Sequence, residues 1–509
     1  MRLAIDIGGT FTDIVLENEH QLLTKKVLTS IAQPELAVIE GISDLLNENN
    51  INSSEIKMII HGTTLATNAI IERKGAKTCF ITTEGFRDVL DIGYESRFDQ
   101  YDILIEKTMS LVPRKHRYVI EERTDINGSQ IKPINTTQFK KLIEKIKSEN
   151  FESIGIGFLH SYANSENENI LKEFIFNNLP GVEVSISSEV CPEIREYERF
   201  TTTVINAYIK PLMSNYLKKL EYELIEKGFN CPLLLMTSGG TLTNIPSACN
   251  NPVRLVESGP AGGAILATSI ARDLGLNKVI SFDMGGTTAK ITIIENKKAI
   301  KAREFEVDRK ARFKKGSGFP LRIPVIEMVE IGAGGGSIAR VNKLEQIITG
   351  PDSAGSLPGP ACYCNGGTLP TITDADLIIG KINPENFAGG KIKLSKDLAA
   401  DAITKNISQI VNLDMDTAAL AISEIVDETM SNAARVHTVE QGHETSSRTL
   451  IAFGGAAPLH VARVAEKSWA CNLTNHLSIY LSIYLSISLS IYLSIYLSLY
   501  LSISLSLYL

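Results

Sequence analysis

The feature that most limits how this chain can fold is a short glycine phrase that occurs twice. Residues 6–13 read DIGGTFTD, and residues 283–288 read DMGGTT. In both places an apolar run leads into the aspartate, and a β-branched run follows the threonines. The repeated pattern predicts two hairpins, each with an aspartate at the end of its first strand. One such turn is typical of an ordinary hairpin, but two copies in matching contexts indicate a shared task.

The residue types in the two phrases suit the binding of phosphate. Glycine has no Cβ, so a glycine turn can adopt positive φ and its backbone amides can approach an anion closely. Asp6 and Asp283 are placed to hold magnesium, because Mg²⁺ prefers one or two carboxylates together with substrate phosphates. Two such hairpins facing each other would hold a nucleotide polyphosphate from both sides. The turn residues that we expect to bind its oxygens are Gly8, Gly9, Thr10, Thr12, Gly285, Gly286, Thr287 and Thr288.

Two further glycine runs accompany the hairpins. In FGGAAPLH (453–460), Gly454 and Gly455 follow an apolar strand and could lie against a flat nucleobase. GAGGGS (332–337) lacks the last glycine of the dinucleotide pattern, and the chain has no phosphate loop of the G-x-x-x-x-G-K-[ST] type. This second run indicates either a phosphate or substrate loop or a plain glycine-rich connection.

A histidine follows the apolar run KMII and is our candidate on the substrate side. His61, with Thr63, Thr64 and Asn68 nearby, could polarise a carbonyl group or move a proton. The alternative interpretation is a core or capping histidine that forms only local hydrogen bonds. The sequence does not separate the two interpretations.

Bulk properties indicate a globular protein of at least two domains. The chain has 509 residues, with 51 basic and 58 acidic side chains and a net charge of -7. This mild acidity argues against a nucleic-acid surface. The start MRLAIDIGG lacks the features of a secretory signal, and seven scattered cysteines do not form a disulfide framework. We therefore expect a cytoplasmic protein without a membrane association.

Short apolar runs and helical patterns alternate along the chain, which predicts an α/β fold. We expect two halves, residues 1–250 and 251–468, because a loop-like stretch separates them and each holds one copy of the glycine phrase. The expected strands are 78–83, 154–158 and 232–236, and the expected helices are 34–48, 137–149 and 201–227, the last kinked or broken at Pro211.

The C-terminal residues 469–509 form a separate, low-complexity segment. From residue 477 they repeat Ser-Ile-Tyr-Leu without a charged side chain. Length and apolarity alone would suit a membrane span, and the alternation would suit an adhesive strand. A TCTA repeat read in its three phases encodes the same four residues in this order. We therefore interpret the tail as translated simple-sequence DNA, non-native or disordered.

The ordered set of motifs resembles the hydantoinase A and oxoprolinase family, within the actin, sugar-kinase and Hsp70 ATPase superfamily. The resemblance extends from residue 1 to about residue 466. Two departures are the repeat, which stands where family members continue, and Cys364, which stands where the family pattern suggests glycine. The motifs that carry the resemblance are DIGGTFTD, HGTTLATNAIIERKG, GFRDVLDIG, LVPRKHRYVIEERTD, TSGG, VESGPAGGA, FDMGGTTAK, EIGAGGGSIA, GPDSAGSLPGPACY, PTITDADLIIG and FGGAAPLH.

The resemblance implies duplicated actin-like (ribonuclease H-like) ATPase domains with a nucleotide cleft between them. It also implies a hydrolase subunit that uses ATP and Mg²⁺ to phosphorylate the carbonyl of a cyclic amide, such as 5-oxoproline or a hydantoin, and so promotes ring opening. Asp6 and Asp283 would organise the metal and the phosphates, and Gly454 and Gly455 would contact adenosine. A hydantoinase B-type subunit and a homo-oligomer are the implied partners.

Three alternatives remain open at this point. The chain could be a small-molecule kinase of the same superfamily, which would release a phosphorylated substrate. It could be a truncated relative that binds nucleotide or a partner without turnover. Carboxylation of a ketone is a variant of the leading interpretation that the sequence does not exclude.

Overall fold

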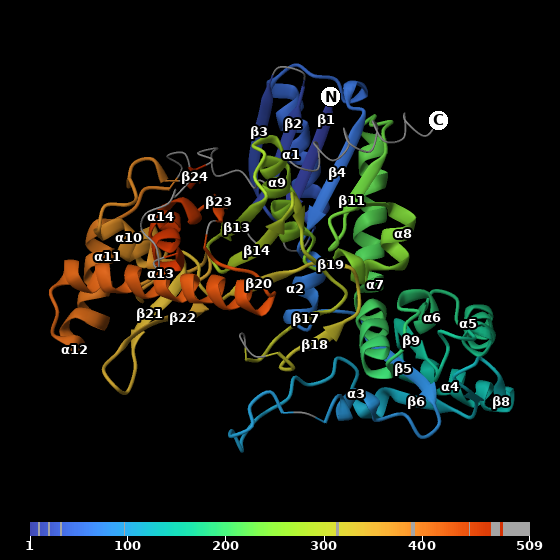
Figure 1. Cartoon of the computed structure of the whole chain (residues 1–509). Coiled ribbons are helices and arrows are strands. Elements are labelled where there is room, and N and C mark those ends of the chain that lie inside the picture. The colour runs from blue at the N-terminus through green and yellow to red at the C-terminus, as the bar shows by residue number, and fades with distance from the viewer. Residues whose placement is uncertain are drawn as a thin grey trace. The chain divides into compact units, whose positions relative to one another are not determined.

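The structure is a computed structural model in which the chain forms two compact units, each built on a mixed sheet with helices (Figure 1). The first unit consists of residues 1–262 and 301–325, and the second of residues 263–300 and the described residues between 326 and 481. The α/β class predicted from the sequence is confirmed. The residues described are 1–8, 11–18, 21–30, 33–95, 97–311, 315–387, 392–446, 448–469 and 479–481.

The main sheet of the first unit has six strands in the order β12-β11-β4-β1-β2-β3. Strands β1 and β2 form the antiparallel hairpin predicted around the first glycine phrase, and β1 runs parallel to β4 on its other side. The central strands are therefore buried on both faces, which explains their continuous apolar runs. The strands are β1 (Arg2–Ile7), β2 (Phe11–Glu17), β3 (Leu22–Leu28), β4 (Met58–Thr63), β11 (Leu233–Met236) and β12 (Leu242–Asn244).

A second sheet in the first unit is entirely parallel, in the order β10-β9-β5-β6. The expected strands 78–83, 154–158 and 232–236 correspond to β5, β9 and β11 within one residue at each end. The strands of this sheet are β5 (Thr78–Thr83), β6 (Arg117–Ile120), β9 (Ser153–Gly157) and β10 (Glu183–Ile186), and small ribbons are formed by β7 (Arg123–Thr124) with β8 (Gln130–Lys132) and by β17 (Phe305–Val307) with β18 (Phe319–Leu321).

The long helix α7 (Glu196–Glu226) packs against both sheets of the first unit. Near its start Phe200 packs on Phe80 of β5, and Gly157 of β9 leaves the necessary space, since a Cβ there would lie 2.5 Å from the Phe200 ring. Further along, buried side chains such as Leu217 join the core of the main sheet. The helix continues through Pro211, so the expected break is absent. Extensive burial of this helix outweighs the one backbone hydrogen bond that proline removes.

The other helices of the first unit follow the amphipathic patterns of the sequence. The expected helix 34–48 is α1, with the same bounds, and the expected helix 137–149 becomes a 3₁₀ turn followed by α4. Apolar residues of α1 at a spacing of three and four face the main sheet, as expected for an amphipathic helix. The helices are α1 (Pro34–Glu48), α2 (Leu65–Ile71), α3 (Val89–Ile92), α4 (Phe139–Glu149), α5 (Glu166–Asn178), α6 (Ser187–Val190) and α8 (Ile245–Asn250).

The sheet of the second unit repeats the central pairing of the first. Strands β13 and β14 form an antiparallel hairpin around the second glycine phrase, and β13 runs parallel to β23. The sheet order is β15-β14-β13-β23-β24, with β20 also paired to β14. The strands are β13 (Lys278–Met284), β14 (Ala289–Glu295), β15 (Lys298–Ala299), β20 (Met328–Ile331), β23 (Thr449–Phe453) and β24 (Ile479–Leu481), and β21 (Ser337–Val341) pairs with β22 (Ile347–Ser353).

Helices of the second unit pack on its sheet through small and aliphatic side chains. Ala418, Ile422 and Val426 of α13 and Ala457, Val461 and Val464 of α14 belong to one buried cluster with Phe282 of β13. The helices are α9 (Ser258–Asp273), which leads the chain into this unit, α10 (Ile372–Ile378), α11 (Lys396–Ile403), α12 (Gln409–Val411), α13 (Met415–Glu440) and α14 (Ala457–Trp469).

The predicted low-complexity tail, 469–509, lies almost entirely outside the described residues. Its described part consists of Trp469, which ends α14, and of β24. In β24, Ile479 to Leu481 pair in parallel with Leu450 to Ala452 of β23. These three residues of the repeat thus add an edge strand to the sheet.

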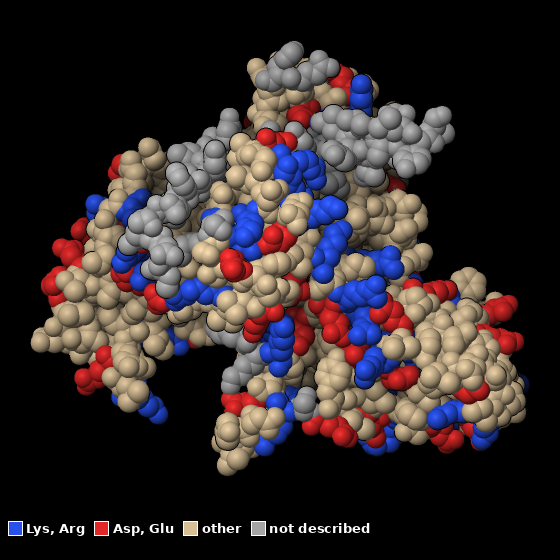
Figure 2. Space-filling view, in the orientation of Figure 1, with Lys and Arg blue, Asp and Glu red and all other residues tan. Residues whose placement is uncertain are grey.

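The surface carries both signs of charge. Acidic and basic side chains are intermingled over the face seen in Figure 2, in keeping with the small net charge of -7. Among the described residues, no helix combines the length and apolar character needed to span a bilayer.

Candidate functional site

Asp6 lies near the end of β1, in the centre of the main sheet of the first unit. It pairs with Gly62 of the parallel strand β4. A Cβ on Gly62 would lie 3.1 Å from the Asp6 Oδ1 atom, and a Cβ on Gly259 would lie 3.8 Å from it. Two glycines from distant motifs thus border this carboxylate. The space that they leave is consistent with a group that a ligand must approach.

Hydroxyl groups fix the hairpin that follows Asp6. The Thr29 hydroxyl donates to the carbonyl oxygen of Gly8 at 3.0 Å, and the Thr12 and Thr29 hydroxyl oxygens are 3.0 Å apart. Thr12 is fully buried. Its hydroxyl therefore stabilises the hairpin from within, and no sequence motif pointed to Thr29 as its partner. The predicted phosphate ligands Gly9 and Thr10 lie outside the described residues.

Hydrogen bonds to the segment after β4 hold the start of helix α9 beside Asp6. The Ser258 hydroxyl donates to the Thr63 carbonyl oxygen at 3.1 Å, and the amide of Glu257 donates to the Thr67 hydroxyl at 3.1 Å. The Thr64 amide and hydroxyl both donate to the carbonyl oxygen of Ile7, each at 3.1 Å. The motifs HGTTLATN and VESGPAGGA therefore meet at the end of β1. Sequence reasoning assigned no site residue to the second motif, although its run of small residues before a helix was a usable signal.

His61 lies in the core of the first unit and does not face the Asp6 carboxylate. It neighbours Asp6 on an adjacent strand one register position earlier, where side chains point to the opposite sheet face. Its Nδ1 is 3.4 Å from the Ile5 carbonyl oxygen and its Nε2 is 2.8 Å from the Tyr216 hydroxyl. Because a carbonyl only accepts, Nδ1 carries the proton and Nε2 accepts from Tyr216.

Burial also keeps His61 neutral. Loss of solvent lowers the pKa of His61 from 6.5 to about 4, and the hydrogen bond to Ile5 opposes this only in part. Both ring nitrogens are engaged and no part of the side chain is exposed. This placement corresponds to the core interpretation of His61, one of the two that the sequence left open.

In the second unit, Asp283 occupies the position in β13 that Asp6 occupies in β1. The turn behind it is closed by a hydrogen bond from the Gly285 amide to the Thr288 carbonyl oxygen at 3.0 Å. Gly286 and Thr287 at the tip are exposed, and Thr288 is half-buried. The backbone of this tip is accessible, as contact with a phosphate would require.

The GAGGGS loop packs directly on that turn. The amides of Gly335 and Gly336 donate to the carbonyl oxygens of Gly285 and Gly286 at 3.1 and 2.7 Å. A Cβ on Gly334 would lie 2.5 Å from the Thr287 nitrogen, so only glycine fits there. The loop is buried throughout. It therefore supports the turn from behind, a role that neither sequence interpretation had described.

The FGGAAPLH turn meets the same hairpin from the side of β23. Gly454 has a φ of 93°, and a Cβ on it would lie 2.5 Å from the Asp283 Oδ1 atom. The Ala456 amide donates to the carbonyl oxygen of Met284 at 2.9 Å. Gly455 is exposed. The structure thus brings three glycine motifs of the second unit together around Asp283.

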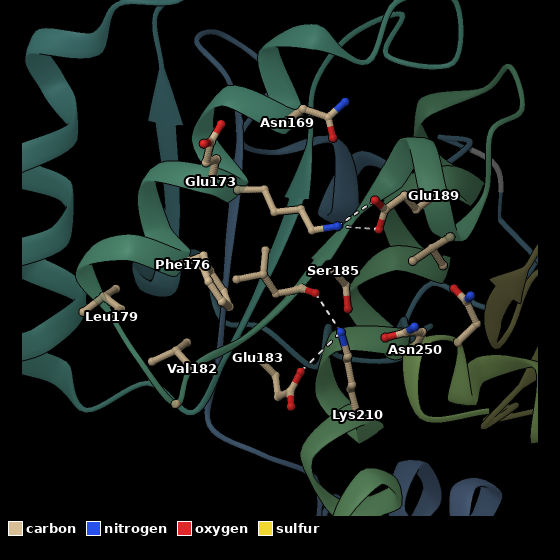
Figure 3. A pocket seen from close by; sticks show the side chains of 15 residues that line it. Asn169, Glu173, Phe176, Leu179, Val182, Glu183, Ser185, Glu189, Lys210 and Asn250 are labelled. Carbon is tan, nitrogen blue, oxygen red and sulfur yellow. Dashed lines mark hydrogen bonds and ion pairs between the residues drawn. The ribbon is translucent and has the colours of Figure 1, made fainter. Parts of the chain in front are cut away.

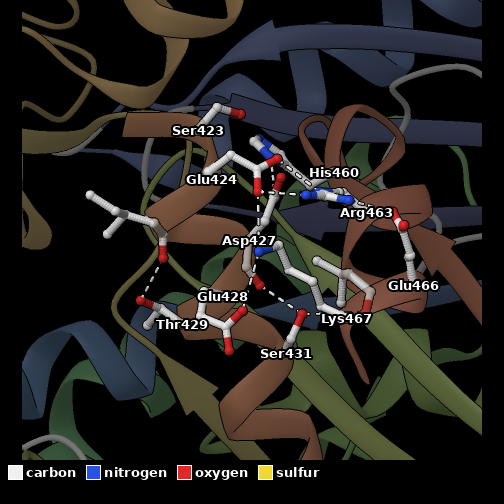
Figure 4. A network of polar contacts seen from close by, with 12 residues as sticks. Ser423, Glu424, Asp427, Glu428, Thr429, Ser431, His460, Arg463, Glu466 and Lys467 are labelled. Carbon is white, nitrogen blue, oxygen red and sulfur yellow. Dashed lines mark hydrogen bonds and ion pairs between the residues drawn. The ribbon is translucent and has the colours of Figure 1, made fainter. Parts of the chain in front are cut away.

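A buried charge cluster of the second unit is centred on His460, which Figure 4 shows with Asp427. His460 of α14 is fully buried, with Nδ1 2.7 Å from Asp427 Oδ1 and Nε2 3.0 Å from Asp376 Oδ2. Burial alone lowers the pKa of His460, but the hydrogen bonds and charges of the two carboxylates outweigh it and raise the pKa to about 9. The imidazole is therefore charged near neutral pH. The sequence gave no signal for this cluster, because its members come from three separate segments.

An open pocket of the first unit is lined by residues other than Asp6. It has a volume of about 830 Å³ and is lined by α5, β10, α6, α7 and the end of α8 (Figure 3). Its lysines are paired, Lys172 with Glu189 at 2.6 Å and Lys210 with Glu183 at 3.3 Å. None of the predicted site residues lines it.

The surroundings of each aspartate, taken within its own unit, suit a magnesium ion that is held mainly by a ligand. Among the described residues, no group of three or more His, Cys, Asp or Glu side chains is arranged to enclose a metal ion. A full protein cage is unnecessary for Mg²⁺, which usually takes one or two carboxylates and fills its other positions with water and phosphate oxygens. Asp6 and Asp283 each offer one carboxylate beside a glycine turn and so fit this type of binding.

Family comparisons agree with the motifs. The Hydantoinase/oxoprolinase N-terminal region matches residues 2–179, and Hydantoinase/oxoprolinase matches residues 199–484. An uncharacterized protein of Methanocaldococcus jannaschii is 43% identical over 92% of this chain and 69% of its own length. Caprolactamase subunit alpha of Pseudomonas jessenii is 33% identical over 92% of this chain and 67% of its own length.

Two further proteins extend the comparison. The acetophenone carboxylase gamma subunit of Aromatoleum aromaticum is 29% identical over 90% of this chain and 64% of its own length. The crystal structure of ATP-dependent caprolactamase from Pseudomonas jessenii superposes with a TM-score of 0.79, at 32% identity, over 92% of this chain and 68% of that one. The chain thus spans about two thirds of the length of these proteins. The chain belongs to the hydantoinase/oxoprolinase family.

Proposed function

We propose that this protein is the ATP-binding subunit of an enzyme that activates the carbonyl group of a cyclic amide and so promotes opening of the ring. The observation that carries the proposal is the environment shared by Asp6 and Asp283. Each ends the first strand of a glycine hairpin, and each lies against a glycine of the neighbouring parallel segment, Gly62 or Gly454. Family membership and the names of the relatives supply the reaction class.

The matching environments support a duplicated actin-like architecture that holds ATP between two phosphate hairpins. In both units the aspartate strand is antiparallel to its hairpin partner and parallel to its other neighbour. In this arrangement the exposed tip at Gly286 and Thr287 contacts phosphate, and Gly454 and Gly455 approach the adenosine. In this proposal the predicted halves, 1–250 and 251–468, are the two ATPase domains, although residues 301–325 of the second half belong to the first compact unit.

The chemistry follows from the stability of amides. Resonance gives the C–N bond of a lactam partial double-bond character and protects its carbonyl carbon from water. Transfer of the terminal phosphoryl group of ATP to the ring carbonyl oxygen gives ADP and an imidate phosphate. Water then adds to the activated carbon, and breakage of the C–N bond gives the opened chain as an acyl phosphate. A second water hydrolyses this acyl phosphate to a carboxylate and inorganic phosphate. Positioning and charge stabilisation are the main tasks of the protein in such a transfer.

Magnesium, held by Asp6 and Asp283, would neutralise phosphate charge when bound. The protein residues contribute the backbone amides of the two turns, which fix the phosphate oxygens. The buried His61 takes no part in this scheme, because both of its ring nitrogens are bound within the core.

A second protein subunit completes the proposed enzyme. The names of two relatives, caprolactamase subunit alpha and acetophenone carboxylase gamma subunit, describe parts of larger assemblies. We infer a hydantoinase B-type partner that contributes to ring opening, and self-association of this chain. The acetophenone carboxylase relative also favours a second candidate function, in which a ketone carbonyl is phosphorylated for carboxylation.

The test is an ATP-dependent phosphate release assay with the full chain, alone and with a B-type subunit. The panel contains 5-oxoproline, a hydantoin, caprolactam and acetophenone with bicarbonate. The proposal expects phosphate release together with a ring-opened product from one cyclic amide. A stable phosphoester would instead identify a kinase, and tight ATP binding without phosphate release under every condition would identify a non-catalytic relative.

A further inference from the structure

Two loops of the second unit are tied to the same turn by backbone hydrogen bonds. The 332–337 loop donates to the carbonyl oxygens of Gly285 and Gly286, and the 454–456 turn donates to that of Met284. The two loops consist mainly of glycine and alanine, so they have few side-chain atoms that could hold the turn in place. Their positions must therefore be set by the elements to which they are attached.

Each loop is attached to the first turn of a helix. Thr373, in the first turn of α10, donates both its amide and its hydroxyl to the Gly335 carbonyl oxygen, at 2.7 and 2.8 Å. The 454–456 turn continues directly into α14, which begins at Ala457. A shift of either helix would therefore move its loop relative to the 285–288 turn.

The buried cluster links these two helices. Asp376 lies one turn after Thr373 on α10, and His460 lies in the first turn of α14. Their side chains are 3.0 Å apart with both almost wholly shielded from solvent. Asp376 also faces Lys381, at 3.4 Å, so its two cationic neighbours balance the two carboxylates of the cluster. A buried pair of this kind resists separation, because either partner alone would be costly to bury.

We propose that the His460–Asp376 pair is a positioning element that holds the 332–337 loop and the 454–456 turn together around the 285–288 turn. His460 acts through the backbone of these loops and touches no reacting atom. Asp427, the other carboxylate beside His460, belongs to α13, which carries neither loop. Ser423 of the same helix donates to Asp376 Oδ1 at 3.3 Å. The proposed link runs directly from α14 to α10 through the His460–Asp376 pair, and α13 contacts both ends of this pair. The effect on nucleotide binding rests on the function proposed above, whereas the link between the loops does not.

The two carboxylates that flank His460 provide a matched pair of variants. Asp376→Asn and Asp427→Asn each remove one carboxylate charge beside the same buried imidazole, and the two aspartates are equally shielded from solvent. Only the first lies on a helix that carries a glycine loop. Hydrogen exchange of the full chain, followed by mass spectrometry, measures the amide exchange rate in peptides that cover 332–337 and 454–456.

The expected result is specific to one variant. Asp376→Asn should speed exchange in both peptides about tenfold, since local opening free energies fall when a charge-assisted contact is weakened. Asp427→Asn should lower the unfolding midpoint to a similar extent while both peptides stay within about twofold of the native protein. Equal acceleration in both variants, or none in Asp376→Asn, would overturn the proposal.

Nucleotide affinity gives a second, separable readout. Binding of a non-hydrolysable ATP analogue should weaken about tenfold in Asp376→Asn and less than twofold in Asp427→Asn. If the native protein binds no nucleotide, the proposed function fails and the exchange result still decides the link between the loops. If Asp376→Asn does not fold, His460→Gln removes the pair from its other side, and unchanged exchange in both peptides of that variant would equally refute the link.

Discussion

Gly454 lies so close to Asp283 that a Cβ on the glycine would stand 2.5 Å from the carboxylate oxygen. The same residue has a φ of 93°, a conformation that favours glycine. In the first unit, Gly62 leaves room for Asp6 in a comparable way, with a distance of 3.1 Å. Space beside a strand-end carboxylate is thus a shared property of the two hairpins, and it can be tested by adding single methyl groups.

The first test is Gly454→Ala. The change should destabilise the protein by about 1–2 kcal/mol because of the positive φ, and should displace Asp283 or the turn as well. We expect weaker binding of an ATP analogue by at least about tenfold, measured by calorimetry. Gly455→Ala is the matched control for stability, because Gly455 lacks a positive φ and a Cβ there meets no atom within 4 Å. Equal losses of unfolding free energy in the two variants would contradict the close contact between Gly454 and Asp283.

A second test concerns His61 and its hydrogen-bond partner. Tyr216→Phe removes the hydroxyl that donates to Nε2 and leaves a buried acceptor unsatisfied, which should cost about 1–3 kcal/mol of unfolding free energy. Phosphate release at saturating substrate should keep its pH profile, because His61 stays neutral and distant from the chemistry. Denaturant unfolding and the pH dependence of the rate are the two measurements. A large fall in rate at unchanged stability would restore a catalytic role for His61.

The stability of the second unit should depend on the charge of His460. Its pKa is raised from 6.5 to about 9 in the folded protein, where it faces Asp376 and Asp427, with Lys381 beyond Asp376. The folded state therefore binds this proton more tightly than the unfolded chain. The stabilisation is complete below pH 6.5 and is lost as the pH rises through about 9, by an amount on the order of a few kcal/mol.

Unfolding by denaturant at pH 6.5 and pH 9.5 measures this dependence. His460→Gln should be less stable than the native protein at pH 6.5, because it leaves two buried carboxylates without their shared cation. Its stability should also vary less over the same interval. Arg463 lies on the same helix as His460, and Arg463→Ala removes an exposed ion pair with Glu424 of α13. This variant should keep the native pH dependence. A native protein whose stability did not fall in this interval would rule out the charged imidazole.

Local patterns in the sequence predicted the elements well where short-range physics decides them. Helix α1 has the expected bounds because a proline in its first turn and an amphipathic face coincide there. The helix break predicted at Pro211 is absent, because tertiary packing of α7 against two sheets outweighs the one hydrogen bond that proline removes. Burial of this kind cannot be read from the helix alone.

The candidate site could be predicted from the sequence only because the Asp-x-Gly-Gly-Thr pattern occurs twice. Asp6 and Asp283 were identified because the same order of residue types occurs at both. The roles of Thr29 and of the 332–337 loop depend on contacts between distant segments, which no local pattern encodes. His460 and Asp376 were visible within motifs, yet their pairing becomes apparent only when three helices are packed together.

The two strand-end carboxylates, Asp6 and Asp283, are central to the proposed binding of magnesium and ATP. Calorimetric titration of the full chain with an ATP analogue, with and without Mg²⁺, should show magnesium-dependent binding by the native protein. Asp283→Asn and Asp6→Asn should each weaken that binding by at least about tenfold at almost unchanged unfolding midpoint, because one charged ligand contact is lost. Native protein that binds no nucleotide, or variants that bind it as tightly with Mg²⁺ as the native protein does, would contradict the account.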